Sequence, residues 1–251
     1  MKLLYYLASI GDGNYDEKLN ILNHNLEYLY EKNKFNFDII INLYNTDDES
    51  YEKINNLIKN KNYIEKYYIY VKCGVLTELF LTNPHNKHIE KYQYILFILD
   101  DVKIKNYDLK KMIEYKKKYQ FEFISPKIIN STHEFMYSLK ECVVLSNILE
   151  IYLILCDKQS FKNFLDSHTI KNKWMWGYDL LFGYNDIKVG INYNDECQHF
   201  YKGGENVIAR KLSDEYIKEK TGLNLTIQDV YNTYKNPIKK IYPNDNLIYY
   251  H

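Results

Sequence analysis

The sequence has 251 residues, and its 33 basic side chains balance its 33 acidic ones, so the formal net charge at pH 7 is zero. A balanced chain has no global field that would favour nucleic acid or an anionic membrane. Arg210 is the only arginine, which further disfavours a protein that reads bases in bidentate geometry. The length suits one large α/β domain.

Asn, Lys, Ile and Tyr are abundant and alanine occurs only as Ala8 and Ala209, a bias typical of AT-rich genomes such as those of large DNA viruses. An isolated Asn, Lys or Tyr is therefore a poor marker of function. The four cysteines form no CxxC pair and have no zinc spacing, which is typical of reduced core residues. We therefore expect a cytoplasmic protein, located in the host cytoplasm if the source is a virus.

The amino-terminal residues 1–10 superficially resemble a signal peptide. Their apolar stretch is short, and Gly11-Asp12-Gly13 follows where a cleavage site would lie. We therefore expect a first β-strand there. No run approaches the roughly 20 apolar residues of a membrane span, so the sequence predicts a soluble protein.

Short apolar runs alternate with amphipathic stretches through the first half of the chain. The strand candidates are residues 2–10, 38–43, 67–71, 94–99 and 121–125. The helix candidates are residues 15–29, 48–59, 74–82, a short stretch after Pro84, and residues 106–119. This rhythm predicts an α/β, Rossmann-like fold with a mostly parallel central sheet flanked by helices, whose ligands bind at the carboxyl ends of the strands.

The second half breaks this rhythm. The strand candidates there are residues 142–145, 150–156 and 187–193, and the helix candidates are a helix capped by Asp157 and residues 206–220 and 227–234. Residues 174–184 read as a loop running into a helix, and the tail from Pro237 as a loop. We expect one domain, with the sheet in residues 1–204 and a helical carboxyl-terminal segment, residues 205–251, packed on it. The tyrosine-rich tail could form an oligomer surface.

Asp100 and Asp101 end the most apolar strand candidate, residues 94–99. Like charges so close repel, and burial makes both harder to ionise. A divalent cation such as Mn²⁺ or Mg²⁺ would offset that cost and keep positions open for phosphate oxygens. The alternative is a pair that caps the next turn, with one carboxylate solvated.

Two later segments contain further candidates. The two tryptophans of the chain, Trp174 and Trp176, are separated by a single residue, and Gly177 and Asp179 follow them. An indole ring is a good platform for a sugar, and a carboxylate beside it could take the proton of an attacking hydroxyl. The alternative is that both tryptophans fill the core and Asp179 sits in the first turn of a helix. His199 could supply a nitrogen ligand to a cation, although an isolated histidine is more often structural.

In the order of these elements the chain resembles the GT-A family of nucleotide-sugar glycosyltransferases. The matching stretches are Leu3 to Gly11, Ile98 to Val102, Trp176 to Asp179 and Gln198-His199, within residues 1–204. The resemblance implies that Asp101 and His199 bind the cation and that Asp100 contacts the ribose or metal-bound water. It further implies that Trp176 and Gly177 bind the acceptor and that Asp179 is the general base of an inverting transfer. One departure is that Leu99 and Val102 occupy the positions that would complete a D-x-D motif.

The nucleotide pocket is less well marked. The resemblance places Ala8 and Ser9 near the base, Tyr44 and Asn45 near uracil or ribose, and Lys72 near a phosphate. Because the composition is rich in Asn, Lys and Tyr, a structural role is the alternative for each of these residues. No glycine-rich phosphate loop occurs, which disfavours kinase-like and nicotinamide-dependent chemistry.

The function predicted from the sequence is therefore metal-dependent transfer of a sugar from a nucleotide donor, with a UDP-sugar as the expected donor, to a hydroxyl of a glycan or protein acceptor. One alternative is a non-catalytic nucleotide- or glycan-binding module that kept the fold. The other is a phosphohydrolase of the haloacid dehalogenase kind, which the position of the aspartates and Val102 disfavours.

Overall fold

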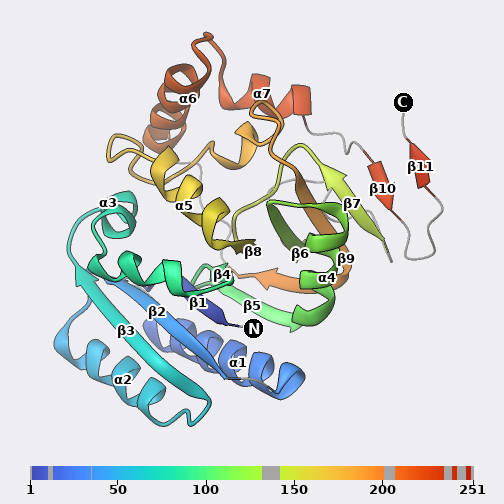
Figure 1. The fold of residues 1–251 in the computed structure, drawn as a ribbon. Coiled ribbons are helices and arrows are strands. Elements are labelled where there is room, and N and C mark those ends of the chain that lie inside the picture. Colours follow the sequence, from blue (N-terminus) through green and yellow to red (C-terminus); the bar gives the residue numbers. More distant parts are fainter. Residues whose placement is uncertain are drawn as a thin grey trace.

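The computed structural model describes residues 2–10, 14–34, 36–131, 142–200, 207–234, 239–241 and 247–249. A single sheet runs through them in the order β11-β10-β7-β9-β6-β8-β4-β1-β2-β3, and β5 pairs with β9 outside this path. Figure 1 shows β1, β2 and β3 with α1 and α2 at one end of the molecule and α6 and α7 at the other.

The amino-terminal part of the sheet is parallel, since β1 pairs in parallel with both β2 and β4, and β2 with β3. These strands are β1 (Leu3–Ile10), β2 (Phe37–Tyr44), β3 (Ile64–Lys72) and β4 (Tyr94–Ile98). Strands β1, β2 and β4 are mostly apolar and are buried on both faces, as expected for parallel strands covered by helices. Their carboxyl ends therefore share one edge of the sheet.

The second part of the sheet is mixed. Strand β8 is antiparallel to β4 and β6, β6 is parallel to β9, and β7 is antiparallel to β9. The strands are β5 (Val102–Asn106), β6 (Phe123–Ile129), β7 (Val143–Ser146), β8 (Leu153–Asp157), β9 (Val189–His199), β10 (Lys239–Ile241) and β11 (Leu247–Tyr249). The expected fold class, an α/β sheet flanked by helices, is confirmed.

Helices pack against this sheet at most crossovers. They are α1 (Tyr15–Asn33), α2 (Asp48–Lys59), α3 (Leu76–Leu81), α4 (Leu109–Tyr119), α5 (Lys158–Ser167), α6 (Val207–Thr221) and α7 (Ile227–Tyr234), with 3-10 helices η1 (Pro84–Lys91) and η3 (Asp179–Leu181). The predicted cap at Asp157 is confirmed, because its side chain accepts a hydrogen bond from the Ser160 amide at 2.9 Å. No helix in the described ranges is both long and apolar enough to cross a bilayer.

Two sequence-based expectations about secondary structure are wrong. The helix expected at residues 106–119 begins only at Leu109, because residues 102–106 form β5, a strand the sequence did not indicate, with Val102 and Ile104 fully buried. The tail beyond residue 237 was expected to be a loop, yet β10 pairs with β7 and β11 with β10. Both strands are short and take their hydrogen bonds from distant segments, which local periodicity does not record.

His168 is a buried histidine whose charged form the fold disfavours. It is 4% exposed, and the described part of the chain offers neither ring nitrogen a hydrogen-bond partner. The rings of Phe164, Tyr178 and Tyr216 surround it. Burial, with a smaller effect of Lys220, lowers the pKa of His168 to about 3.

We expect His168 to make the fold acid-labile. Its pKa is lower in the folded chain than the value of about 6.5 in an unfolded one, so below pH 6.5 the unfolded chain binds the extra proton. The free energy of unfolding should therefore fall by about 2 kcal/mol from this group between pH 6.5 and 5. Urea denaturation of the wild type and His168→Phe at both pH values measures the difference, which the variant should lack.

Asp195 serves as the control, because burial raises its pKa to about 6 and its effect has the opposite sign. In Asp195→Asn the loss of stability on acidification should be larger than in the wild type. An equal pH slope in His168→Phe and the wild type would show that His168 does not control acid stability.

Candidate active site

Asp100 and Asp101 form the turn between β4 and β5, at the edge where β1 and β2 also end. Both residues are half-buried. The strand leading to them is fully buried from Ile95 to Ile98, apart from 2% exposure at Phe97. The carboxylates therefore emerge from the core at the place where open α/β sheets bind their ligands.

His199 is held beside Asp101 by the pairing of β5 with β9. Val102 lies opposite His199 in this antiparallel ladder, and the Phe200 amide donates to the Asp101 carbonyl at 3.0 Å. The His199 Nε2 lies 3.0 Å from the Asp101 Oδ2. The Tyr152 ring stacks on the imidazole, with ring centroids 4.3 Å apart. Backbone pairing and stacking together fix the imidazole against the carboxylate.

The surroundings of His199 favour its charged form. Burial lowers the pKa of the imidazole, but the hydrogen bond and charge of Asp101 outweigh it, with further contributions from Glu150 and the Asn130 contact, so the pKa is raised overall. Glu150 is 2% exposed and accepts a hydrogen bond from the Ser131 hydroxyl. A buried carboxylate thus lies near enough to His199 to favour the charged imidazole.

Asp100 has a partner of its own on α1. The Lys18 Nζ lies 2.9 Å from the Asp100 Oδ2, and both side chains are 13% exposed. Burial alone would lower the pKa of Lys18, but the charge and hydrogen bond of Asp100 raise it overall, with smaller contributions from Tyr44 and Asp101. The ammonium group therefore lies among side chains from the ends of β2 and β4.

The residues present suit a small divalent cation in one respect. The Asp101 Oδ1 and the His199 Nδ1 are buried and have no hydrogen-bond partner among the described residues. Carboxylate oxygen and imidazole nitrogen are ligands for Mn²⁺ and Mg²⁺, which commonly complete their coordination with water and substrate phosphates. In the described ranges, however, no group of three or more His, Cys, Asp or Glu side chains could hold a metal ion. Among the described residues, a cation here would therefore have two protein ligands at most, Asp101 and His199.

The residues expected to bind the nucleotide lie at the ends of three neighbouring strands. Ala8 is fully buried in β1, where Ser9 follows it; Tyr44 is the last residue of β2, and Asn45 comes directly after it. Asn45 is exposed and has a left-handed backbone, with φ of 52°. Tyr44 lies close enough to Lys18 to affect its pKa.

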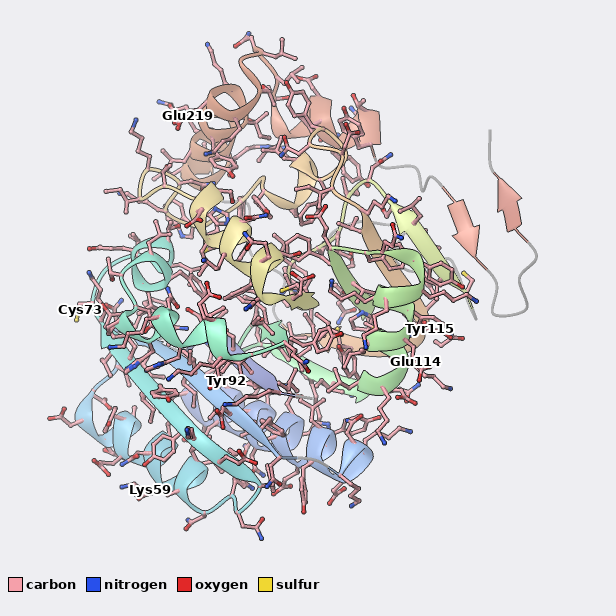
Figure 2. All side chains as sticks on the ribbon, viewed as in Figure 1. Lys59, Cys73, Tyr92, Glu114, Tyr115 and Glu219 are labelled. Carbon is pink, nitrogen blue, oxygen red and sulfur yellow. The ribbon has the colours of Figure 1, made fainter. Side chains whose placement is uncertain are left out.

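Lys72 occupies a different environment from the acidic pair. Its Nζ lies 2.9 Å from the Glu78 Oε1 and 3.2 Å from the Thr82 Oγ1. The next residue, Cys73, is exposed on the rim of the molecule in Figure 2. The structure therefore shows Lys72 neutralised by α3 at the outer edge of the sheet, where a phosphate would have to displace Glu78.

The segment of residues 172–177, which contains both tryptophans, is anchored to α3. The Thr77 amide donates to the Lys173 carbonyl at 3.3 Å, and the Asn172 Nδ2 donates to the Trp176 carbonyl at 2.8 Å. Trp176 is 42% exposed, so it does not fill the core. Gly177 has a φ of 93°, and a Cβ there would lie 3.4 Å from Ile217. The fold thus uses glycine to present an exposed indole.

Asp179 begins η3 directly after this segment and is half-buried. Burial raises the pKa of Tyr216 on α6 to about 12, and the charge of Asp179 adds a smaller contribution. The Asp179 carboxylate therefore lies near α6. The expected loop running into a helix is reduced here to a short 3-10 turn.

Sequence reasoning missed Lys18, Glu150 and Tyr152. Lysine and tyrosine are so frequent in this chain that neither Lys18 nor Tyr152 stands out. Glu150 was read as the start of a strand, whereas β8 begins at Leu153. The one available signal was that Glu150 is the single charged residue in the otherwise apolar run from Ile148 to Leu155.

No protein-family model and no curated protein sequence matches the chain. Among solved structures it is similar to GalNAc-T7 with UDP, GalNAc and Mn²⁺, with a TM-score of 0.63 and 9% identity over 86% of this chain and 47% of that one. It is also similar to S. aureus TarS residues 1–349 in complex with UDP-GlcNAc, with a TM-score of 0.53 and 13% identity over 92% of this chain and 69% of that one. The chain thus spans less than half of the first protein, and the fold is that of GT-A glycosyltransferases.

Proposed function

We propose that this chain is a metal-dependent glycosyltransferase that moves a sugar from a nucleotide-diphosphate donor, UDP-sugar above all, to an acceptor hydroxyl. The observation that carries the proposal is the pair formed by Asp101 and His199, whose Oδ2 and Nε2 face each other at 3.0 Å. A cation bound by both side chains would replace this hydrogen bond, and the buried Asp101 Oδ1 has no hydrogen-bond partner among the described residues. The pair lies at the edge of a GT-A sheet where ligands bind.

Asp101 and His199 would hold Mn²⁺ or Mg²⁺, and Asp100 would contact the ribose or metal-bound water. When bound, the cation supplies positive charge that stabilises the diphosphate as it leaves. Ala8, Ser9, Tyr44 and Asn45 would form the pocket for the base and ribose at the ends of β1 and β2. Lys72 would contact a phosphate only after leaving Glu78.

The acceptor would bind against Trp176 and the backbone at Gly177. Asp179 would take the proton of the acceptor hydroxyl while the hydroxyl oxygen forms the new bond to the anomeric carbon. The bond from that carbon to the donor phosphate breaks, and the nucleoside diphosphate carries away the electron pair. Direct attack from the opposite face inverts the anomeric centre. The acceptor in this proposal is a glycan or a protein in the cytoplasm.

In this proposal residues 1–204 hold the site, and residues 205–251 pack on the same domain. The strand pairs of β10 with β7 and β11 with β10 support that packing, since they attach the tail to the same sheet. Contacts between α7 and η3 support it as well.

The test is calorimetric titration of the full chain with UDP, with and without Mn²⁺, followed by turnover of a panel of UDP-sugars. We expect UDP to bind at least about tenfold more tightly with Mn²⁺, a difference of 1.4 kcal/mol. Absence of UDP binding in both conditions would contradict the proposal.

A non-catalytic nucleotide-binding module is the second candidate. It is favoured by the ion pair of Lys18 with Asp100, which engages the carboxylate that would contact the ribose or the metal-bound water. Mn²⁺-dependent UDP binding without release of UDP from any UDP-sugar, even with added glycans, would support the module over the enzyme.

A further inference from the structure

Lys18 reaches into the proposed site from the first turn of α1. The Lys18 amide donates to the Asn14 carbonyl at 3.1 Å, so this residue belongs to the closed helix and its backbone is fixed. Helix α1 starts shortly after β1 ends, which places its first turn above the edge shared by β1, β2 and β4. The ammonium group meets Asp100 there at 2.9 Å.

The two aspartates are paired separately. Lys18 partners Asp100, whereas His199 partners Asp101. With 13% exposure on each side, Lys18 and Asp100 form a pair that is largely shielded from water, where charge effects are stronger than on an open surface. Breaking such a pair is costly unless another charge replaces the lost partner.

A diphosphate donor brings that replacement charge. An ammonium group on a flexible four-carbon stem can change partners within a small space, and it binds phosphate as a point charge. We propose that Lys18 exchanges partners when the donor binds, leaving Asp100 for an oxygen of the diphosphate and releasing Asp100 towards the ribose or the hydrated cation. This inference rests on the proposed function and assigns Lys18 as a donor-binding residue.

The exchange has consequences of opposite sign for the two ligands. Without nucleotide, the ammonium repels a divalent cation and occupies Asp100, so Lys18→Met should tighten Mn²⁺ binding about tenfold. With Mn²⁺ saturating, the same variant lacks the contact to the diphosphate, so UDP binding should weaken about tenfold. A purely structural ion pair would not move the two affinities in opposite directions.

The experiment measures Mn²⁺ binding by the electron paramagnetic resonance signal of the free ion, and UDP binding by calorimetry at saturating Mn²⁺. Lys18→Arg keeps the charge and should stay within about threefold of the wild type in both measurements. Lys53→Met is the matched control, because Lys53 forms an exposed pair with Glu49 on α2. Thermal melting reports whether each variant folds, and Lys18→Gln replaces Lys18→Met if the latter does not.

Three results would overturn the inference. If the wild type binds Mn²⁺ and UDP but Lys18→Met changes neither affinity, Lys18 has no part in donor binding. If both affinities fall together, the ion pair is only structural. If the wild type binds neither ligand, the proposed function fails and takes this inference with it.

Discussion

Replacing Asp101 by asparagine should abolish metal-dependent turnover of a UDP-sugar, with a loss of at least about a thousandfold, or ~4 kcal/mol in the barrier. Asparagine keeps the shape of the side chain, and the backbone carbonyl of residue 101 still accepts the hydrogen bond from the Phe200 amide, so β5 and β9 should stay paired. It removes the negative charge that faces His199 and that a cation would need. Release of UDP from the donor measures the loss.

Asp166→Asn is the control for this substitution, because Asp166 is an exposed aspartate on α5. It should leave turnover unchanged. Thermal melting should show Asp101→Asn folded, with a cost of about 1 kcal/mol for the altered hydrogen bond. Full activity in Asp101→Asn would refute the assignment of Asp101 as the cation ligand.

Replacing Asp179 by asparagine should remove sugar transfer while leaving donor binding intact. A positioned general base typically contributes about 10²–10⁴-fold to the rate, and an amide cannot accept the proton of the acceptor hydroxyl. The half-buried position of Asp179 beside the exposed Trp176 is what makes this residue the candidate. Transfer to a glycan acceptor and UDP affinity with Mn²⁺ should be measured on the same preparation.

The matched control is Asp186→Asn, at an exposed position shortly after η3 with a φ of 54°, which asparagine tolerates well. Its transfer rate should equal that of the wild type. A retained rate in Asp179→Asn would point to another base or to a retaining mechanism. A parallel loss of UDP affinity would instead show that Asp179 holds the fold of the site.

Local sequence patterns identified much of the amino-terminal half of the fold. Apolar runs with few charges predicted β1, β2 and β4 within one or two residues, because strands buried on both faces need apolar side chains throughout. The stripe from Tyr15 to Leu29 predicted α1 for a similar reason. The abrupt change from Leu99 to Asp100 marked the strand end that now carries the candidate site.

Strand β5 shows where this reasoning failed. Val102 and Ile104 alternate with Lys103 and Lys105, which is the period of a half-buried strand, but five residues are too few to outweigh the longer helical pattern that follows. The strand exists because β9 supplies its hydrogen bonds from almost a hundred residues away. The same holds for β10, whose partner is β7.

The sequence by itself thus determined the α/β class, the edge of the sheet that matters and the acidic pair placed there, because burial and periodicity are local properties of the chain. Only the tertiary structure decided that His199 faces Asp101, that Lys18 meets Asp100 and that Glu150 lies near enough to His199 to raise its pKa. Strand register and helix placement set those contacts, and both depend on packing between distant segments.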